Sequence, residues 1–517
     1  MNFDEILNEI GSFGWYQIAV WIQLGIVMHV FISLNMSFVV FAVAAPDWSC
    51  ETTAPNGSTI QSTDCAVFDS CEHIIYEEDI LTVPTEFRLY CDMAFVGELL
   101  PSVQIGGLLV GATIWGQLAE VFGRRWTLFA IVLLELISGL LVSYAPTWQW
   151  YAVLLCLTGT SVGGFWCVEF VLMQEITGEK IRPMMFLING YLVGGFVSAY
   201  VQWHFKNWRL LSFWVNVIGF VSIPSYFFIV KESPRWLIAH GNFDEAKSVI
   251  RSIAACNRKK ITEDTLEKVQ KLVHKPDDTK LRKRYSYWHL CRTPKMTLLF
   301  GVLLISWFCN SLASYGLYYN LKSLPGNRYA NFFISAAIGA AENFLTYFAS
   351  LKLRRKVLYQ ISMMTVIFCL VVTTITYELL VDLDQDVRDG IIVWAVLIAR
   401  TLTGPAWLVN YLYSAELFPT VIRPHSNSVG SVVARLGGML GPVVLYLRLT
   451  WISLPYIIWI FVLVFNAILA AAFLPETKGK PLNETLPENG WKIFTKNKKD
   501  NDLVFTTEGD CFTETMV

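Results

Sequence analysis

Ionisable side chains inside long apolar stretches are the residues of this sequence best suited to do chemistry. Arg435 lies in Val433-Ala-Arg-Leu-Gly-Gly-Met-Leu-Gly-Pro442, and its planar guanidinium fork suits a carboxylate or a sulfate. Glu169 and Glu342 lie in other apolar stretches, where each can hold an ammonium group or pair with Arg435. Because charge is costly in apolar surroundings, all three are candidate ligand-binding residues. Packing between helices is the alternative for Arg435, and a third acid, Glu135, receives no role.

The surrounding sequence predicts helices that cross a membrane. Of the 517 residues, 54% are hydrophobic and only 16% are charged. Apolar runs of roughly 20 residues, enough to cross a bilayer as a helix, alternate with short charged loops. We therefore predict an all-α polytopic membrane protein of about twelve helices. The sequence contains no phosphate-binding loop and no hydrolase motif, so we expect neither an ATP-driven pump nor an enzyme.

The predicted helices fall into two sets of six. The first set is Trp15–Ala45, Ala94–Trp115, Trp126–Tyr144, Trp150–Leu172, Met185–Phe205 and Trp208–Val230. The second set is Met296–Tyr319, Tyr329–Ser350, Val357–Leu379, Gly390–Tyr413, Asn427–Leu447 and Trp451–Leu474. Such a division is typical of two homologous halves around a central site. The predicted domains are therefore an N-terminus (1–14), a first half (15–230), a central loop (231–295), a second half (296–474) and a tail (475–517).

Loop charge predicts the orientation of the chain. The first loop, residues 46–93, carries ten acids and one base, whereas the central loop carries sixteen Lys and Arg against eight acids. Because basic loops stay in the cytoplasm, both termini are expected there, with the first loop outside a plasma membrane. The basic run Arg282-Lys-Arg284 is expected to lie on anionic membrane lipid.

Cysteine and glycosylation signals agree with an outer first loop. Four of the eleven cysteines lie in it, and an even cluster in an oxidising compartment predicts two disulfides of undetermined pairing. A zinc site made by Cys65, Cys71 and His73 is the alternative. Asn56-Gly57-Ser58 is a glycosylation acceptor. The disulfide candidates are Cys50, Cys65, Cys71 and Cys91.

Four motifs suggest a family. Three of them are Gly116-Gln-Leu-Ala-Glu-Val-Phe-Gly-Arg-Arg125, whose Gly116 and Gly123 are expected to allow a tight turn, Glu232-Ser-Pro-Arg-Trp-Leu237 and Leu474-Pro-Glu-Thr-Lys-Gly479. They resemble motifs of the major facilitator superfamily. The fourth, Tyr413-Ser-Ala-Glu-Leu-Phe-Pro-Thr-Val-Ile-Arg423, together with the four-cysteine loop, resembles the organic anion/cation/carnitine transporter family of solute carriers. The resemblance implies a major facilitator fold that works by alternating access.

Charged residues at the cytoplasmic helix ends, several of them in these motifs, predict a gating latch of ion pairs. Ordinary loop charge that reaches toward water is the alternative. The second-half loop Leu351-Lys-Leu-Arg-Arg-Lys356 lacks the glycine of its counterpart, so a looser network is expected there. The latch residues are Glu120, Arg124, Arg125, Glu175, Arg182, Glu232, Arg235, Glu416 and Arg423.

Aromatic residues complete the expected pocket. The resemblance places Trp166, Trp307 and Tyr315 at cavity positions, where aromatic rings stack flat ligands and attract cations. Most other aromatic residues are expected to face lipid or to pack between helices. His29 is interpreted as a packing residue, with a proton relay as the alternative.

These features predict a polyspecific transporter of organic anions or carnitine-like zwitterions, with Arg435 binding the carboxylate. The resemblance implies an acid in cation carriers where this chain has Gly339. An organic cation transporter that uses Glu342 and Glu169 is the nearest alternative, and a non-transporting receptor or scaffold is the next. No cofactor is expected, and the coupling ion (sodium, proton or counter-anion) is left open. The tail Thr515-Met516-Val517 fits the groove of a PDZ-domain protein.

Overall fold

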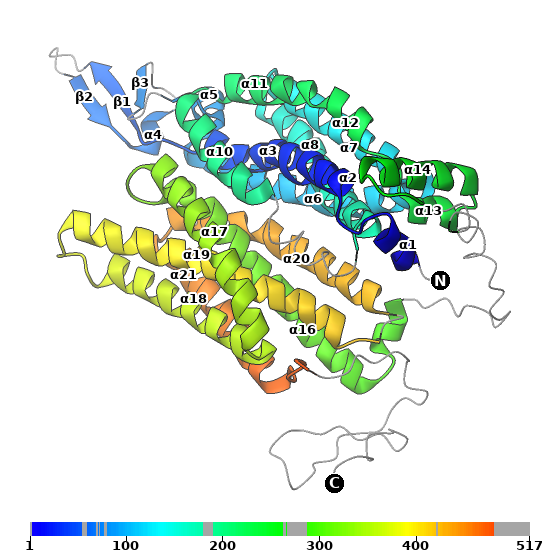
Figure 1. Ribbon diagram of the computed structural model, residues 1–517. Helices are drawn as coiled ribbons and strands as arrows, with labels where there is room; N and C mark the ends of the chain where they lie inside the picture. Colours follow the sequence, from blue (N-terminus) through cyan, green and yellow to red (C-terminus); the bar gives the residue numbers. More distant parts are fainter. Residues whose placement is uncertain are drawn as a thin grey trace, which may run out of the picture.

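The chain is a multi-pass helical membrane protein. The structure, a computed structural model, describes residues 3–53, 59–68, 71, 73–76, 80–178, 190–261, 265, 287–419 and 422–479. Within these residues, eleven helical stretches are long and apolar enough to cross a membrane (Figure 1). Large apolar side chains lie on the outside, among them Phe228 at 85% and Phe461 at 74% exposed. Contact with lipid accounts for this exposure.

The first group of helices is drawn from blue to green in Figure 1. Its first span joins α2 (Trp15–Val20), the π-helical segment η1 (Trp21–Met28) and α3 (His29–Ala42). The others are α6 (Ala94–Phe122), α7 (Arg124–Val142), α8 (Trp148–Ile176), α10 (Gly190–His204), α11 (Trp208–Val221) and α12 (Ile223–Ile229). Of the predicted span Met185–Phe205, only the part in α10 lies within the described residues.

The second group runs from green to red. It contains α16 (Pro294–Asn320), α17 (Arg328–Lys352), α18 (Arg355–Glu378), α19 (Gln385–Glu416), α20 (Arg423–Tyr446) and α21 (Leu454–Phe473). Short 3-10 turns adjoin these helices at η3 (Tyr287–Cys291), η4 (Leu321–Ser323) and η5 (Leu447–Leu449).

The turn between α6 and α7 is shorter than the motif suggested. We expected both Gly116 and Gly123 to form it, and this is wrong for Gly116, which lies inside α6. Only Gly123 has a positive φ, at 91°, a conformation that favours glycine. The residues between the two glycines form the last turns of α6.

Glycine allows the closest helix pairs to touch along their backbones. A Cβ added at Gly111 of α6 would lie 1.9 Å from the carbonyl oxygen of Thr160 in α8. In the second group, a Cβ at Gly437 of α20 would lie 2.4 Å from the carbonyl oxygen of Phe308 in α16. Lipid supplies little hydrophobic drive between helices, so close approach of this kind holds membrane helices together.

The first loop contains a small antiparallel sheet that the sequence analysis did not predict. Its strand order is β2-β1-β3, and Cys50 in β1 pairs in register with Ser62 and Ile74. Its elements are β1 (Trp48–Thr53), β2 (Thr59–Ser62), β3 (His73–Tyr76), α4 (Cys65–Phe68), α5 (Val83–Phe87) and η2 (Cys91–Met93). We call the end of the protein that carries this sheet the loop face.

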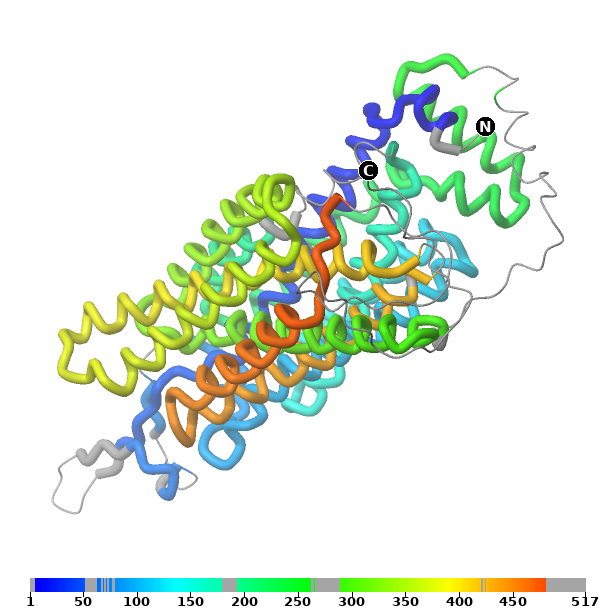
Figure 2. The backbone as a smooth tube through the Cα atoms, turned by 90° about the horizontal axis from the view of Figure 1, so that it is seen from below, coloured from blue at the N-terminus to red at the C-terminus, as the bar shows by residue number. Residues whose placement is uncertain are grey.

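The opposite end, the terminal face, carries α1 (Phe3–Glu9), α13 (Pro234–Ala239) and α14 (Phe243–Cys256). Figure 2 shows α1 beside these two helices. Asn257 ties them together, because its Nδ2 donates to the carbonyl of Ile10 at 2.9 Å and its Oδ1 accepts from the backbone N–H of Tyr16 at 2.9 Å. The start of the chain is therefore anchored to the segment that follows α12.

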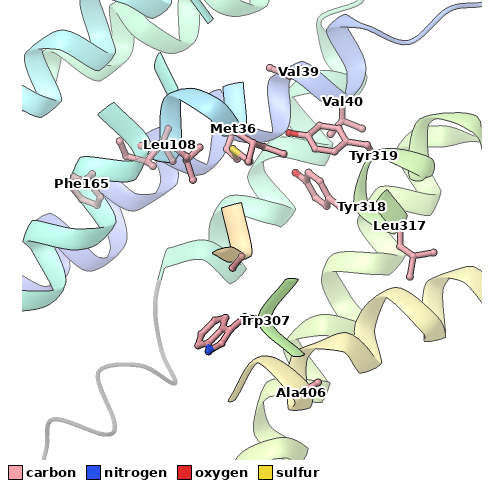
Figure 3. Packing of buried hydrophobic residues seen from close by; sticks show 14 of the residues in the cluster. Met36, Val39, Val40, Leu108, Phe165, Trp307, Leu317, Tyr318, Tyr319 and Ala406 are labelled. Atoms are coloured by element: carbon pink, nitrogen blue, oxygen red, sulfur yellow. The ribbon is translucent and has the colours of Figure 1, made fainter. Parts of the chain in front are cut away.

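The two groups meet near the loop face. Phe41 of α3 stacks on Tyr329 of α17 with ring centroids 5.4 Å apart, and Ser102 of α6 donates to the carbonyl of Met439 in α20 at 2.6 Å. One buried apolar cluster includes residues of both groups, such as Val40 of α3 and Tyr319 of α16 (Figure 3). Figure 1 shows the groups diverging toward the terminal face.

Candidate functional site

Arg435 is a charged residue in the middle of α20, and no described side chain serves as its counter-ion. Its Nη1 donates to the hydroxyl of Ser431 at 2.8 Å and to the backbone carbonyl of Ser431 at 3.3 Å. Its Nε is buried and has no acceptor. Among the ion pairs of the described residues, none involves Arg435. The guanidinium also lies within electrostatic range of Cys167, which belongs to α8 of the first group.

Two predicted residues lie near each other in α8. Trp166 stacks on His29 of α3, with ring centroids 6.5 Å apart and planes 23° apart, and its Nε1 is buried without an acceptor. Glu169 follows one turn later and is half-buried. Its carboxylate has no hydrogen bond or ion pair with any described residue. An unpaired carboxylate therefore lies on α8, while an unpaired guanidinium lies on α20.

Glu342 is engaged inside the second group. Its Oε1 accepts the hydroxyl of Thr346, and its Oε2 would lie 2.7 Å from a Cβ added at Gly404 of α19. The guanidinium of Arg400 acts on it electrostatically and lies 5.1 Å from the ring centroid of Tyr318. The structure therefore places Glu342 against α19, in a different setting from that of Glu169.

The two aromatic residues of α16 differ in position. Trp307 is fully buried, its Nε1 donates to Ser414 at 3.2 Å, and its ring lies 4.7 Å from that of Tyr411. In this conformation it packs against α19. Tyr315 is half-buried, and its ring lies 2.8 Å from where a Cβ of Gly438 would be. Tyr315 therefore lies beside α20, one turn from Arg435.

In the first group, several latch residues form one connected network around Arg124. Arg124 binds Glu175 in a bidentate pair, at 2.9 Å through Nη2 and 3.2 Å through Nε, and it also binds Glu120 at 2.9 Å. Glu232 caps α7, because its carboxylate accepts the backbone N–H groups of Arg124 at 2.8 Å and Arg125 at 3.1 Å. Burial raises the pKa of Glu232 even though these N–H groups act against that shift.

An equivalent network in the second group includes residues that the sequence analysis missed. Glu476 caps α18 by accepting the backbone N–H groups of Arg355 at 2.9 Å and Lys356 at 3.2 Å. Arg355 binds Glu416 through a single contact of 3.4 Å, and the hydroxyl of Thr477 donates to Glu416 at 2.6 Å. Both groups have the same order of residues: an arginine follows the second helix of the group, and an acid follows the last one. This repeat was the signal that could have identified Arg355 and Glu476.

Three other predicted latch residues, Arg125, Arg235 and Arg423, each lie in the first turn of a helix. Arg423 begins α20, and its Nε and Nη2 are buried without acceptors. Arg235 lies half-buried in α13, and the side chain of Arg125 donates to the carbonyl of Phe227 at 3.1 Å. Arg182 lies outside the described residues.

An ion pair between the groups was also missed. Lys322 of η4 binds Glu98 of α6 at 2.9 Å, with only 5% and 17% of the two side chains exposed. The second carboxylate oxygen of Glu98 is buried and accepts no hydrogen bond. Neither residue belongs to a motif that the sequence analysis identified, and their meeting depends on how the two groups come together at the loop face.

Two disulfides fix the first loop. Cys50 is bonded to Cys71, and Cys65 is bonded to Cys91. The zinc alternative is wrong for this structure, because both sulfurs that it requires are used in these bonds. The glycosylation acceptor Asn56 and the tail Thr515-Met516-Val517 lie outside the described residues.

Comparison with known proteins gives one family model and several relatives. The model described as "Sugar (and other) transporter" matches residues 27–487. The chain is 30% identical to "Solute carrier family 22 member 2" of Rattus norvegicus over 88% of this chain and 81% of that protein. It is 27% identical to "Organic cation transporter protein" of Drosophila melanogaster, covering 94% of each. It is also 27% identical to "Organic anion transporter 3" of Oryctolagus cuniculus, covering 96% of each.

Solved structures resemble the fold. The inward-open xylose transporter XylE from E. coli superimposes with a TM-score of 0.60 at 15% identity, over 88% of this chain and 96% of that one. At this identity, the likeness supports the arrangement of helices alone.

Proposed function

Since this chain belongs to solute carrier family 22, organic ion transporters within the sugar (and other) transporter family, we propose that it carries organic anions or carnitine-like zwitterions. Arg435 would bind the carboxylate of such a substrate, and Glu169 or an aromatic face would bind an ammonium group when one is present. Transport itself is a family property, and members of the family are not enzymes. The sign of the substrate charge is the new element of the proposal.

The single observation that supports the proposal is the unpaired guanidinium of Arg435. Among the described residues, its hydrogen bonds go to Ser431 on its own helix. A guanidinium held inside a membrane protein without a counter-ion is unfavourable. An organic carboxylate would supply the missing charge and could accept two parallel N–H bonds from the planar fork.

A zwitterion would also use the opposite group. Glu169 in α8 is a carboxyl group with no hydrogen bond or ion pair to a described residue, and Arg435 acts electrostatically on Cys167 of the same helix. The stacked rings of Trp166 and His29 and the ring of Tyr315 offer flat faces for an apolar body. A substrate with both charges would interact with both groups and favour their approach.

For alternating access, we propose residues 15–230 and 296–474 as the two moving halves. The loop face would be extracellular at the plasma membrane and both termini cytoplasmic, an orientation supported by loop charge and by two disulfides in the first loop. The networks around Arg124 and Arg355 would then lie at the cytoplasmic face and hold the helix ends that gate the site. Substrate can shift the two states only through different affinities for them.

The test is uptake in cells that express the transporter, with variants normalised to their amount at the surface. Arg435→Ala should lower uptake of a radiolabelled carboxylate or carnitine-like zwitterion by at least about tenfold, because a charged hydrogen-bonded contact is lost. Arg435→Lys should restore only part of it, since the planar fork is missing. The control is Arg388→Ala at the loop face, where the described ion pair of the wild-type side chain is a weak one with its neighbour Asp389 at 4.0 Å. Unchanged anion and zwitterion uptake in Arg435→Ala would refute the assignment.

An organic cation transporter is the second candidate, favoured by the two in-span acids Glu169 and Glu342. Cationic dye uptake that survives Arg435→Ala but is lost in Glu342→Gln would select it. A receptor or scaffold on the same fold is the remaining alternative. Counterflow in proteoliposomes tests that alternative, because a scaffold exchanges no solute. Glycosylation at Asn56 and binding of the tail to a PDZ domain stay predictions.

A further inference from the structure

Glu135 is a buried acid in α7 that the proposed transport mechanism does not use. Its side chain is buried within the first group, with 1% of the residue exposed. Neither carboxylate oxygen accepts a hydrogen bond from a described residue. An ionised carboxylate cannot be left bare in such surroundings without a large cost.

The polar groups next to Glu135 have already used their donors. The hydroxyl of Ser161 and the amide of Asn35 lie near the carboxyl group. However, the Ser161 hydroxyl donates to the carbonyl of Leu157 at 3.3 Å. The Asn35 amide donates to the carbonyl of Phe31 at 3.3 Å and to Oδ1 of Asn216 at 3.1 Å.

The same surplus of acceptors continues around Asn35. The Nδ2 of Asn216 donates to Oδ1 of Asn35 and to the carbonyl of Ser212. The Nε2 of Gln104 donates to the backbone carbonyl of Asn35 at 3.2 Å. The Oε1 of Gln104 is buried and accepts no hydrogen bond from a described residue. The cluster therefore joins α3, α6, α7, α8 and α11 and lacks positive hydrogen-bond donors.

No charged side chain of the described residues compensates Glu135. Arg124 and Arg125 begin the same helix but are held by the network at the terminal face. Arg209 of α11 is paired with Glu86 at the loop face at 2.7 Å. Within the described part of the chain, the side chains that act on Glu135 are those of Ser161 and Asn35. The remaining titratable residues on the helices around it are His29, Glu98, Glu120, Tyr151, Cys156, Cys167, Glu169 and Glu175.

We propose that Glu135 is the centre of a buried site for a monovalent cation, a proton or Na⁺, enclosed in the first group of helices. Either ion would remove the uncompensated charge. Na⁺ is a hard cation that prefers oxygen ligands, and the carboxylate of Glu135, the hydroxyl of Ser161 and the amide oxygen of Asn35 are of that kind. The site is separate from the substrate site proposed around Arg435 and does not depend on which substrate is carried.

The experiment measures thermal unfolding of the purified full-length protein in detergent, without substrate. Melting is compared in NaCl and in the same concentration of N-methyl-D-glucamine chloride, and then across about pH 6 to about pH 9. Glu135→Gln keeps the shape of the side chain and removes its charge. Glu169→Gln is the matched control, because it makes the same change one helix away at a residue that does not act on Glu135.

A Na⁺ site predicts that Na⁺ raises the melting temperature of the wild type by about 2–4 °C and that Glu135→Gln removes the shift, whereas Glu169→Gln keeps it. A proton site predicts no Na⁺ effect. In that case, the wild type loses stability relative to Glu135→Gln as pH rises, because deprotonation leaves the charge bare. Ser161→Ala is a second, milder variant that should weaken whichever dependence is found. The proposal fails if Glu135→Gln alters neither dependence.

Discussion

The carboxylate of Glu476 lies across the first turn of α18 and accepts the backbone N–H of Arg355 at 2.9 Å. Glu232 does the same for Arg124 at the start of α7, at 2.8 Å. The two caps are alike in geometry but differ in surroundings. Burial opposes the ionised form in both, yet backbone N–H groups lower the pKa of Glu476, whereas burial prevails at Glu232 and raises its pKa.

The two caps therefore predict mutational effects of opposite sign. Glu476→Gln should lower the free energy of unfolding at neutral pH by about 1 kcal/mol, because an ionised cap is lost. This contribution is present above the ordinary carboxyl pKa and disappears as pH falls through the lowered one. Glu232→Gln should be neutral or stabilising at neutral pH, since a raised pKa means that ionisation disfavours the folded state there. Thermal melts of both variants from acidic to neutral pH test the difference, and equal losses at neutral pH would contradict it.

The two arginines at the terminal face should differ in sensitivity. Arg124 makes a bidentate pair with Glu175, but Arg355 makes one contact of 3.4 Å with Glu416. Lysine cannot reproduce a fork, so Arg124→Lys should reduce initial uptake by about tenfold and Arg355→Lys by about twofold. Uptake per transporter at the cell surface is the measurement. A larger effect at Arg355 would show that the second network is the tighter one, contrary to this expectation.

The buried pair of Glu98 and Lys322 should hold the loop face closed. Glu98→Gln leaves the Lys322 ammonium unpaired and mostly buried, which costs about 3–5 kcal/mol in the closed arrangement, so states open at this face should gain population. Labelling of Ser102→Cys by a membrane-impermeant maleimide reports that opening, because Ser102 is buried beside the contact. We expect faster labelling in Glu98→Gln, and the double variant Glu98→Gln/Lys322→Gln should return toward the parent rate. Labelling that is equally slow in all three would argue against a closing role.

Substitution at the closest helix contact should be costly. Gly111→Ala forces a methyl group into the backbone of α8, where the Thr160 oxygen is 1.9 Å from the new Cβ, and we expect a loss of about 2–3 kcal/mol. Gly301→Ala in α16 is the control, because a Cβ there meets nothing within 4 Å; it should be neutral or stabilising by up to about 1 kcal/mol. The comparison is made by thermal melting of the purified proteins. Similar melting of the two variants would mean that α6 and α8 can separate without cost.

The sequence predicted the helical membrane fold because apolar length is a local property. Glu120 could be named as a partner of Arg124 because both lie in one motif, whereas Glu175 was expected only as a member of the latch at the helix ends. The pairing of Glu98 with Lys322 could not be predicted, because it joins segments 224 residues apart whose contact depends on how the two groups dock. The burial of Trp307 could not be predicted for the same reason: whether an aromatic residue lines a cavity or packs on a neighbouring helix depends on the rotation of that helix.

The backbone contacts at Gly111 and Gly437 restrict how this protein can change shape. Helices that touch main chain to main chain have no layer of side chains in which to slide, so α6 with α8, and α16 with α20, should travel as rigid units. Displacement is then concentrated where α6 meets α20, and there the neighbour of Gly106 is the flexible thioether of Met439. Because the helix pairs on both sides are rigid, strain is concentrated at the flexible contact between α6 and α20. Substitutions at this contact should therefore change the rate of the conformational cycle more than the stability of either helix pair.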